Sequence, residues 1–404
     1  MKMVWKEKPL GELCQIELGK TPSRGNKSLW DTEKTTTNVW LSIADLLNGE
    51  DNIITDSKEY VSDKGAKVCK VVKSGTLLVS FKLTLGRLAF AGRDLFTNEA
   101  IAALTFKNEN ELSKEFLYYY LSFFDWNAAT EGDFKIKGRT LNKAKLKEIA
   151  IRFPESLPEQ QRIVSVLDEA FASIAQAKSN AERNLVNARE LFESVLQSSF
   201  ENVGKDWEVK KFGELYSFKN GINFDKTQKI GKGILTIDVL NMYNEGTQVD
   251  LSQLYRVNKE VSGEYILKNG DILIVRSSVK KEGVAWATFF RETDEPITFC
   301  GFIIRGRPIE KINPEYIVHF LRSSVTREKL IKTATQSTIT NINQQNLSQL
   351  IVPVPPLAEQ RAIVGRLEAL SAETGRLEEI YQQKIESLEE LKKSVLARAF
   401  NGEL

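Results

Sequence analysis

Apolar residues recur at steps of three and four across residues 357–400. This spacing places them on one stripe of an α-helix, with charged residues on the other faces. No proline interrupts the stretch, so it predicts one helix that would reach on the order of 60 Å at ~1.5 Å per residue. A helix of that length is rarely stable alone and needs a partner along its apolar stripe. The stripe consists of Ile363, Leu367, Leu370, Leu377, Tyr381, Ile385, Leu388, Leu391 and Val395.

The partner stretch lies in the same chain, at residues 157–200. It aligns with residues 357–400 without a gap at an offset of 200 positions, and the identities cluster at its two ends. A generic coiled coil would share only its apolar positions, so the match indicates an internal repeat. Identical pairs include Leu157/Leu357, Glu159/Glu359, Gln160/Gln360, Leu191/Leu391, Val195/Val395 and Phe200/Phe400.

A globular segment precedes each helical stretch. In the first segment, residues 71–80 predict a turn at Ser74-Gly75 followed by a buried strand. Further strands are expected within 83–91, 98–106 and 149–153, and a short buried helix at 115–124. The second segment repeats this order, while the loops between matching positions diverge. The predicted fold is therefore mixed α+β, with two α/β segments in tandem. We expect a first globular domain at 1–155, a central helix at 156–204, a second globular domain at 205–355 and a C-terminal helix at 356–404.

The charge is distributed unevenly between these parts. The net charge of the chain is only +2. The two helical stretches with their flanks (156–204 and 356–404) carry 11 basic and 16 acidic residues, whereas the rest carries 45 basic and 38 acidic residues. A nucleic-acid partner would therefore meet the globular segments. The start has no apolar run of the signal-peptide kind and no stretch approaches membrane-spanning length, so we expect a cytoplasmic protein.

Catalytic interpretations find little support in the sequence. His319 is the only histidine and lies in a predicted buried helix, where a structural role is favoured. The three cysteines (Cys14, Cys69 and Cys300) are far apart and are expected to be buried free thiols without a metal. Residues 313–316 (Asn-Pro-Glu-Tyr) resemble the Asn-Pro-Pro-Tyr box of amino-methyltransferases. A helix cap at Asn313 followed by a proline in the first turn explains them more simply.

Three kinds of loop carry candidate DNA contacts. Residues 133–147 alternate Lys and Arg with small residues, a pattern that suits phosphate contacts, although a solvated surface fits as well. The loops at 80–86 and 276–283 each follow a strong strand and contain Lys or Arg with Ser or Thr. Residues 336–346 are polar and nearly uncharged, and their amides could bind adenine as Arg binds guanine. The candidates are Lys82, Thr84, Arg87, Lys135, Lys137, Arg139, Lys143, Arg276, Ser277, Lys280, Lys281, Gln336, Thr338, Asn341 and Asn343.

The repeated Leu-x-Glu-Gln-x-x-Ile-Val helix starts, each after a proline-rich stop, resemble those of a known family. With the terminal KSVLARAFNGEL at 393–404, they are similar to the specificity (S) subunit of type I restriction-modification enzymes, and the resemblance covers the whole chain. It implies two target recognition domains, each binding one half of a split DNA site in the major groove. It also implies that the two long helices pair antiparallel and fix the gap between the half-sites.

The same resemblance implies partners and a role without catalysis by this chain. Two methyltransferase subunits would dock on the helices and recognition domains, and motor–nuclease subunits would join them. S-adenosylmethionine, ATP and Mg²⁺ would belong to those partners, and none would be bound here. The residues expected to hold the helix pair or the partners are Glu159, Gln160, Leu191, Phe200, Glu359, Gln360, Leu388 and Phe400. A charge at Leu191 or Leu388 is expected to separate the helices.

Other functions stay open at this point. The specificity chain of a type IIB-like restriction system would have the same recognition role with different partners. A coiled-coil adaptor that binds no DNA, and an autonomous methyltransferase, are further alternatives. Salt-dependent DNA binding by the assembled complex would exclude the adaptor, and the methyltransferase would have to bind S-adenosylmethionine by itself.

Overall fold

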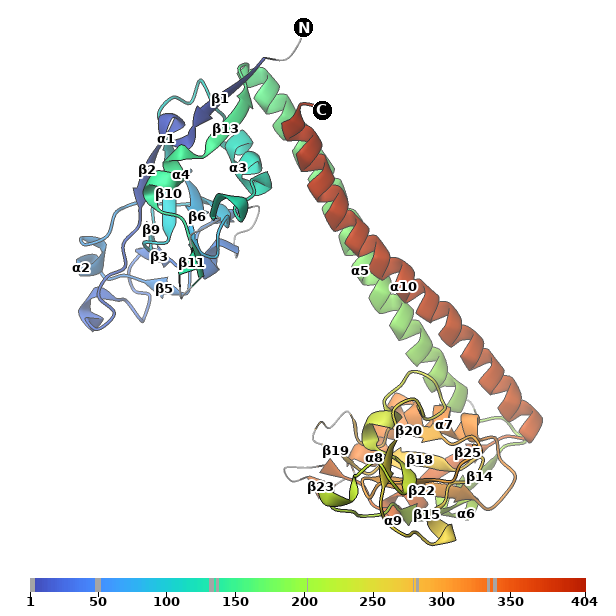
Figure 1. Cartoon of the computed structure of the whole chain (residues 1–404). Coiled ribbons are helices and arrows are strands. Elements are labelled where there is room, and N and C mark those ends of the chain that lie inside the picture. The colour runs from blue at the N-terminus through green and yellow to red at the C-terminus, as the bar shows by residue number, and fades with distance from the viewer. Residues whose placement is uncertain are drawn as a thin grey trace. The chain divides into compact units, whose positions relative to one another are not determined.

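A computed structural model describes residues 4–47, 52–130, 134–135, 138–201, 203–278, 280, 283–332, 335–336 and 340–404. The chain divides into two compact units (Figure 1). Unit 1 consists of Met1–Asn180 and Lys384–Leu404, and unit 2 consists of Ala181–Gln383. Each unit therefore contains one globular segment and parts of both long helices. The four-part division expected from the sequence stays a prediction.

Unit 1 is built on an antiparallel sheet to which one parallel edge strand is added. Its five strands run in the order β2-β10-β6-β8-β4, and smaller sheets have the orders β5-β3-β9, β11-β12-β7 and β1-β13. The elements are β1 (Trp5–Pro9), α1 (Leu10–Leu13), β2 (Cys14–Leu18), β3 (Val39–Leu41), β4 (Ile53–Ile54), β5 (Glu59–Tyr60), α2 (Asp63–Ala66), β6 (Leu77–Ser80), β7 (Lys82–Leu83), β8 (Leu88–Ala91), β9 (Phe96–Thr97), β10 (Ile101–Phe106), α3 (Lys114–Phe123), β11 (Phe134–Lys135), β12 (Gly138–Thr140), α4 (Lys143–Glu148), β13 (Ala150–Pro154) and the long helix α5 (Leu157–Glu201).

Unit 2 repeats this plan. Its main sheet has the order β15-β22-β18-β20, with smaller sheets β17-β16-β21, β19-β24-β23 and β14-β25. The elements are β14 (Glu208–Lys211), α6 (Phe212–Leu215), β15 (Tyr216–Asn220), β16 (Ile234–Ile237), β17 (Tyr255–Val257), β18 (Ile272–Val275), β19 (Ser277–Ser278), β20 (Ala287–Phe289), β21 (Ile297–Phe299), β22 (Ile303–Pro308), α7 (Pro314–Arg322), α8 (Ser324–Lys332), β23 (Thr335–Gln336), β24 (Thr340–Asn341), α9 (Gln344–Ser348), β25 (Ile351–Val354) and the long helix α10 (Leu357–Asn401). Tandem α/β units followed by long helices are the fold that the sequence predicts.

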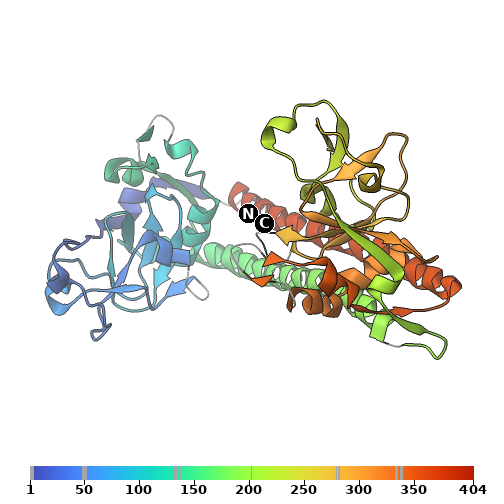
Figure 2. The same cartoon turned by 90° about the horizontal axis from the view of Figure 1, so that it is seen from below.

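The two long helices pack together antiparallel within each unit. In unit 1, Ile163 and Leu167 of α5 share a core with Leu396 and Phe400 at the far end of α10. In unit 2 the roles are exchanged, and Leu196 and Phe200 of α5 join Ile363, Val364 and Leu367 of α10 in the core. Both views place the C-terminus beside the start of α5, where Arg162 donates a hydrogen bond of 2.8 Å to the carbonyl oxygen of Leu404 (Figures 1 and 2).

We call the line of contact between α5 and α10 the seam. One residue that the sequence analysis assigned to it lies outside it. Buried positions of α5 recur every seven residues, at Leu167, Ile174, Ala181 and Ala188. This phase brings Phe192 and Val195, both partly buried, to the core of unit 2. Leu191 precedes Phe192 and is 49% exposed, so the prediction that it holds the helix pair is wrong. Leu388 of α10 is half-buried.

Candidate nucleic-acid interface

In both units, two loops chosen from the sequence join one small sheet. In unit 1, β7 pairs with β12, so that Lys82 lies opposite Thr140 and Leu83 opposite Arg139. In unit 2, β19 pairs with β24, so that Ser277 lies opposite Asn341 and Ser278 opposite Thr340. Each pairing joins segments about sixty residues apart and begins directly after an interior strand of the main sheet, β6 in unit 1 and β18 in unit 2. We call these two sheets, β11-β12-β7 and β19-β24-β23, the paired-loop sheets.

The two paired-loop sheets have the same backbone frame. The N–H of Leu141 donates to the carbonyl oxygen of Phe81 at 3.0 Å, and the N–H of Ile342 donates to the carbonyl oxygen of Arg276 at the same distance. A helix then follows in each unit, α4 capped by the side chain of Asn142 and α9 capped by that of Asn343. The frame is duplicated, and its side chains differ in charge and size.

In unit 1, the candidate side chains fall into two groups. Lys82 is half-buried with its amino group 5.2 Å from the centroid of the Phe81 ring, and Thr84 and Lys143 are exposed. Arg87 differs, because its guanidinium donates to the carbonyl oxygen of Ile43 at 3.1 Å. Lys82, Thr84 and Lys143 can therefore reach a ligand, whereas Arg87 already holds a backbone group of its own unit.

In unit 2, the candidates form a polar cluster. The hydroxyl of Ser277 donates to the amide oxygen of Asn341. Arg276 is half-buried with a long contact of 3.5 Å from its guanidinium to the carbonyl oxygen of Gly301, and Lys280 is exposed. The amide oxygen of Asn343 accepts from the N–H of Asn346 at 2.7 Å. Because this oxygen caps α9, Asn343 in this conformation does not offer a free amide for two-bond recognition of adenine.

The remaining candidates lie at the edge of what the structure describes. Lys137, Lys281 and Thr338 lie outside the described residues. For Lys135, Arg139 and Gln336, the strand positions in the paired-loop sheets are described and the side chains are not.

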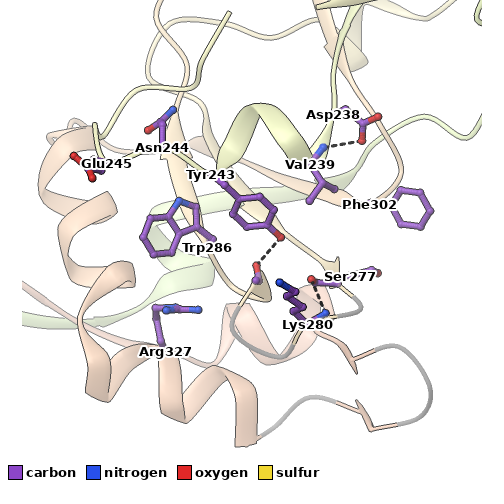
Figure 3. Close-up of a pocket in the computed structure, with 12 residues that line it drawn as sticks. Asp238, Val239, Tyr243, Asn244, Glu245, Ser277, Lys280, Trp286, Phe302 and Arg327 are labelled. Atoms are coloured by element: carbon purple, nitrogen blue, oxygen red, sulfur yellow. Dashed lines mark hydrogen bonds between the residues drawn. The ribbon is translucent and has the colours of Figure 1, made fainter. Parts of the chain in front are cut away.

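A pocket of about 860 Å³ opens next to the paired-loop sheet of unit 2 (Figure 3). Ser277, Ser278 and Lys280 form part of its lining, and the aromatic rings of Tyr243, Trp286 and Phe302 form another part. Sequence reasoning missed these three aromatic residues, because they come from separate loops with no shared motif. It also missed Leu83 in unit 1, which is 56% exposed and has a positive φ of 64° that leucine rarely adopts.

Two glutamines join the long helices to the globular parts. The amide of Gln160 is bonded to the backbone of residues 111, 113 and 154, and that of Gln360 to residues 313 and 355. Both side chains are buried, so these glutamines act inside the chain. Glu159 instead forms an exposed ion pair with Arg162 at 2.7 Å, and Glu359 is exposed.

The ends of the long helices carry aromatic anchors. Phe400 packs against Phe116, Tyr120 and Phe123 of α3, with ring centroids 5.3–5.6 Å apart. Phe200 packs in the same way against Tyr316 and Phe320 of α7. Each globular part is thus held by the start of the helix that follows it and by the end of the other helix.

Comparison with known proteins agrees with this duplicated architecture. The model of the type I restriction modification DNA specificity domain matches the chain twice, at residues 3–183 and 204–387. The chain belongs to this family. Each match covers one globular part and more than half of the long helix that follows it, so the domain that the family defines includes the glutamine contact at the start of each helix.

Curated relatives of this specificity-domain chain are themselves specificity subunits. The chain is 26% identical over 331 residues to the type I restriction enzyme EcoBI specificity subunit of Escherichia coli, a match that covers 73% of this chain and 67% of that protein. It is 27% identical to the MjaIX specificity subunit of Methanocaldococcus jannaschii over 54% of this chain and 53% of the relative.

Two solved structures share the fold over the whole chain. One comes from a study of complex assembly and conformational transition of the type I R-M system, with a TM-score of 0.77, 17% identity and 100% of both chains covered. The other is the HsdS subunit from Thermoanaerobacter tengcongensis, with a TM-score of 0.62, 17% identity and 99% and 97% of the two chains covered.

Within the specificity domains, the residues considered for catalysis occupy structural positions. His319 is buried in α7, and burial, helped by the positive charge of Arg322, lowers its pKa to about 4. Asn313 caps α7 through its side-chain oxygen with Pro314 in the first turn, which explains the methyltransferase-like tetrapeptide. Cys14 and Cys300 are buried free thiols, whereas Cys69 is only partly buried.

The described residues offer neither a metal-binding cluster nor a membrane-spanning helix. They contain no group of three or more His, Cys, Asp or Glu side chains that could hold a metal ion. None of the helices they form is long and apolar enough to cross a membrane.

Proposed function

We propose that the chain is the DNA-specificity subunit of a type I restriction-modification complex, in which each unit recognises one half of a bipartite DNA site. The observation that carries this proposal is the duplicated paired-loop sheet. Its backbone pairing is the same in both units, while Lys82-Leu83 in unit 1 is replaced by Ser277-Ser278 in unit 2. A duplicated frame with different side chains suits a protein that reads two different half-sites.

In this proposal, the side chains divide between phosphate contact and base contact. Lys82, Lys143 and Lys280 would contact phosphates, which gives affinity without sequence information. Ser277 and Asn341 would face base edges in the major groove. The excess of basic residues outside the helical stretches supports this division.

The antiparallel helices would set the distance between half-sites. An error of one base pair rotates a half-site by ~35° on a duplex with ~10 bp per turn, so the spacer must be stiff. Two linked modules also raise the effective concentration for the second contact. The buried seven-residue repeat of α5 and the ion pair between Arg189 and Glu378 at 2.7 Å support a fixed helical pair.

The complex would contain further subunits in the cytoplasm. Two methyltransferase subunits would bind on the helices, where Val186 and Leu191 of α5 and Ile380 of α10 are each about half exposed. Motor–nuclease subunits would join them. The partners, rather than this chain, would bind S-adenosylmethionine, ATP and Mg²⁺ and perform the chemistry.

The test is to co-express the chain with its methyltransferase partner and to sequence the host DNA for methylated adenines. The expected result is a split motif with a fixed gap that disappears when the chain is deleted. Replacing residues 1–155 with another recognition segment should change one half of the motif, and adding seven residues to both long helices should lengthen the gap.

Four results would contradict the proposal. A swap of residues 1–155 that changes both halves would oppose modular recognition, and an unchanged gap in the lengthened chain would oppose the spacer role. If the assembled complex shows no salt-dependent DNA binding, the chain is an adaptor. Partners that combine nuclease and methyltransferase in one chain would instead indicate a type IIB-like system.

A further inference from the structure

The pocket of unit 2 is lined by exposed aromatic side chains, which protein surfaces seldom gather in one place. Phe302 is 57% exposed and Tyr243 is 42% exposed, and both line the pocket together with half-buried Trp286. In the view of Figure 3, Tyr243 lies between Trp286 and Phe302. Exposed aromatic rings that gather around one concavity usually mark a contact site.

The pocket walls are held in place before any ligand arrives. Arg322 and Arg327 lie over the Trp286 ring, 4.3 and 5.2 Å from its centroid. Arg322 is itself fixed by hydrogen bonds of 2.8–3.0 Å to three backbone carbonyl oxygens. The hydroxyl of Tyr243 donates to the carbonyl oxygen of Gly283 at 3.2 Å. A preorganised wall loses little conformational entropy on binding.

The corresponding place in unit 1 has different chemistry. Arg87 and Trp286 occupy the same position in the two frames. The backbone N–H of Ser80 donates to the carbonyl oxygen of Arg87, and the backbone N–H of Val275 donates in the same way to the carbonyl oxygen of Trp286. By the same pairing, buried Ala100 corresponds to exposed Phe302. The aromatic wall is therefore a feature of unit 2, and it marks a difference in what the two units recognise.

Pairing of the DNA strands limits what the aromatic wall can contact. In an intact duplex the faces of the bases are stacked, so a protein meets only base edges, sugars and phosphates. The 5-methyl group of thymine is the apolar group that base edges present in the major groove. A wall of aromatic rings has few hydrogen-bonding groups to offer and suits that methyl group.

We infer that Phe302 and Tyr243 read a thymine in the half-site bound by unit 2, through contact with its 5-methyl group. Trp286 completes the wall, and Ser277 and Lys280 at the rim lie where they can bond neighbouring base edges and phosphate. This inference rests on the proposed function and names one base that unit 2 selects.

Deoxyuridine tests the inference because it pairs like thymine and lacks only the methyl group. The complex of the full chain with its methyltransferase subunits is titrated with duplexes that carry the mapped motif, with each thymine replaced in turn. One replacement in the half-site of unit 2 should weaken binding about fourfold, the effect of one buried methyl-sized group. In the Phe302→Ala complex, the same replacement should have no further effect.

The variants are chosen so that folding is preserved. Phe302 is largely exposed, so its truncation leaves no buried cavity. Leu240→Ala is the matched control, because Leu240 is 83% exposed in the turn before Tyr243 and does not belong to the pocket lining. The complex with Leu240→Ala should keep the full deoxyuridine effect.

Several outcomes would overturn the inference while leaving the proposed function intact. They are specific binding with no deoxyuridine effect in this half-site, an equal effect in the Phe302→Ala complex, or a half-site without thymine. Tighter binding to a duplex whose base is left unpaired would show that the pocket takes a displaced base instead. Failure of the wild-type complex to bind any split motif would refute the proposed function itself.

Discussion

The side-chain amide oxygen of Gln160 accepts a hydrogen bond of 2.8 Å from the backbone N–H of Ser113, the residue that caps α3. The amide nitrogen of Gln160 donates to the carbonyl oxygens of Glu111 and Pro154 at 2.9 and 2.8 Å. One buried side chain therefore connects the first turn of α5, the cap of α3 and the end of β13. Gln360 repeats the arrangement in unit 2, with the N–H of Asn313 as donor at 2.9 Å.

Replacing either glutamine with leucine should destabilise the unit that contains it. Gln160→Leu leaves buried backbone groups of residues 111, 113 and 154 without partners, which should cost on the order of 2–4 kcal/mol of unfolding free energy. Hydrogen exchange should show α3 opening in this variant and α7 opening in Gln360→Leu. Gln161→Leu is the control, because Gln161 is exposed on the next position and should change stability by no more than ~0.5 kcal/mol. Equal protection of α3 in all three variants would show that this contact carries no stability.

A charge at Leu191 should leave the helix pair intact. Because Leu191 is 49% exposed, Leu191→Asp should change the free energy of unfolding by about 0.5 kcal/mol or less. Leu196 is 2% exposed in the core of unit 2, and Leu196→Asp should cost more than ~3 kcal/mol because a charge is buried without a partner. Thermal unfolding of the purified chains measures both. A large loss of stability in Leu191→Asp would instead show that Leu191 packs in the seam.

The stability of unit 2 should fall as the pH drops from 6.5 towards 5. Burial, and secondarily Arg322, lowers the pKa of His319 from 6.5 to about 4, so in this range the unfolded state binds a proton that the folded state does not. The loss should approach about 1.4 kcal/mol per pH unit. Hydrogen exchange of α7 at several pH values measures it, and the step should vanish in His319→Leu. Since His319 is the only histidine, α3 of unit 1 serves as an internal control. A persistent step in His319→Leu would assign it to another group.

Lys82→Ala should weaken DNA binding, whereas Arg87→Ala should lower the stability of unit 1. Loss of a phosphate contact at Lys82 should reduce the slope of log K against log salt by about 1, equally for all DNA sequences. Arg87 holds the carbonyl oxygen of Ile43, so its removal should lower the stability of unit 1 by about 1–2 kcal/mol and leave the salt slope unchanged. Binding titrations at several salt concentrations and thermal unfolding separate the two effects. A reduced slope in Arg87→Ala would place its guanidinium on DNA.

The long helices could be predicted from the sequence almost to the residue. The stretches 157–200 and 357–400 correspond to α5 (Leu157–Glu201) and α10 (Leu357–Asn401), because a sustained helical period is a strong local signal. The choice of seam residues was less accurate. A helical stripe is wide enough to include Leu191, whereas the contact with α10 is a narrower line through Ala188 and Phe192.

The turn predicted at Ser74-Gly75 and the buried strand after it are confirmed by the φ of +81° at Gly75 and by β6 (Leu77–Ser80). The candidate site was harder to predict. The sequence identified the loops that form the paired-loop sheets, but pairing over about sixty residues has no local signal. The aromatic wall likewise depends on tertiary structure, since Tyr243, Trp286 and Phe302 come together only when β18 pairs with β20 and β22. Arg87 shows that residue type alone does not distinguish a DNA contact from an internal bond.

Phe400 also affects when unit 1 can close while the chain is being synthesised. The aromatic surface of α3 that it covers is synthesised first, and Phe400 follows about 280 residues later, the separation of positions 116 and 400. At typical rates of translation, the delay is roughly ten seconds to a minute. During that time Phe116 and its neighbours have no helix end to cover them, whereas α7 of unit 2 follows Phe200 and finds it already made. Unit 1 is thus translated first but closes last, because its core waits for a side chain from the other end of α10.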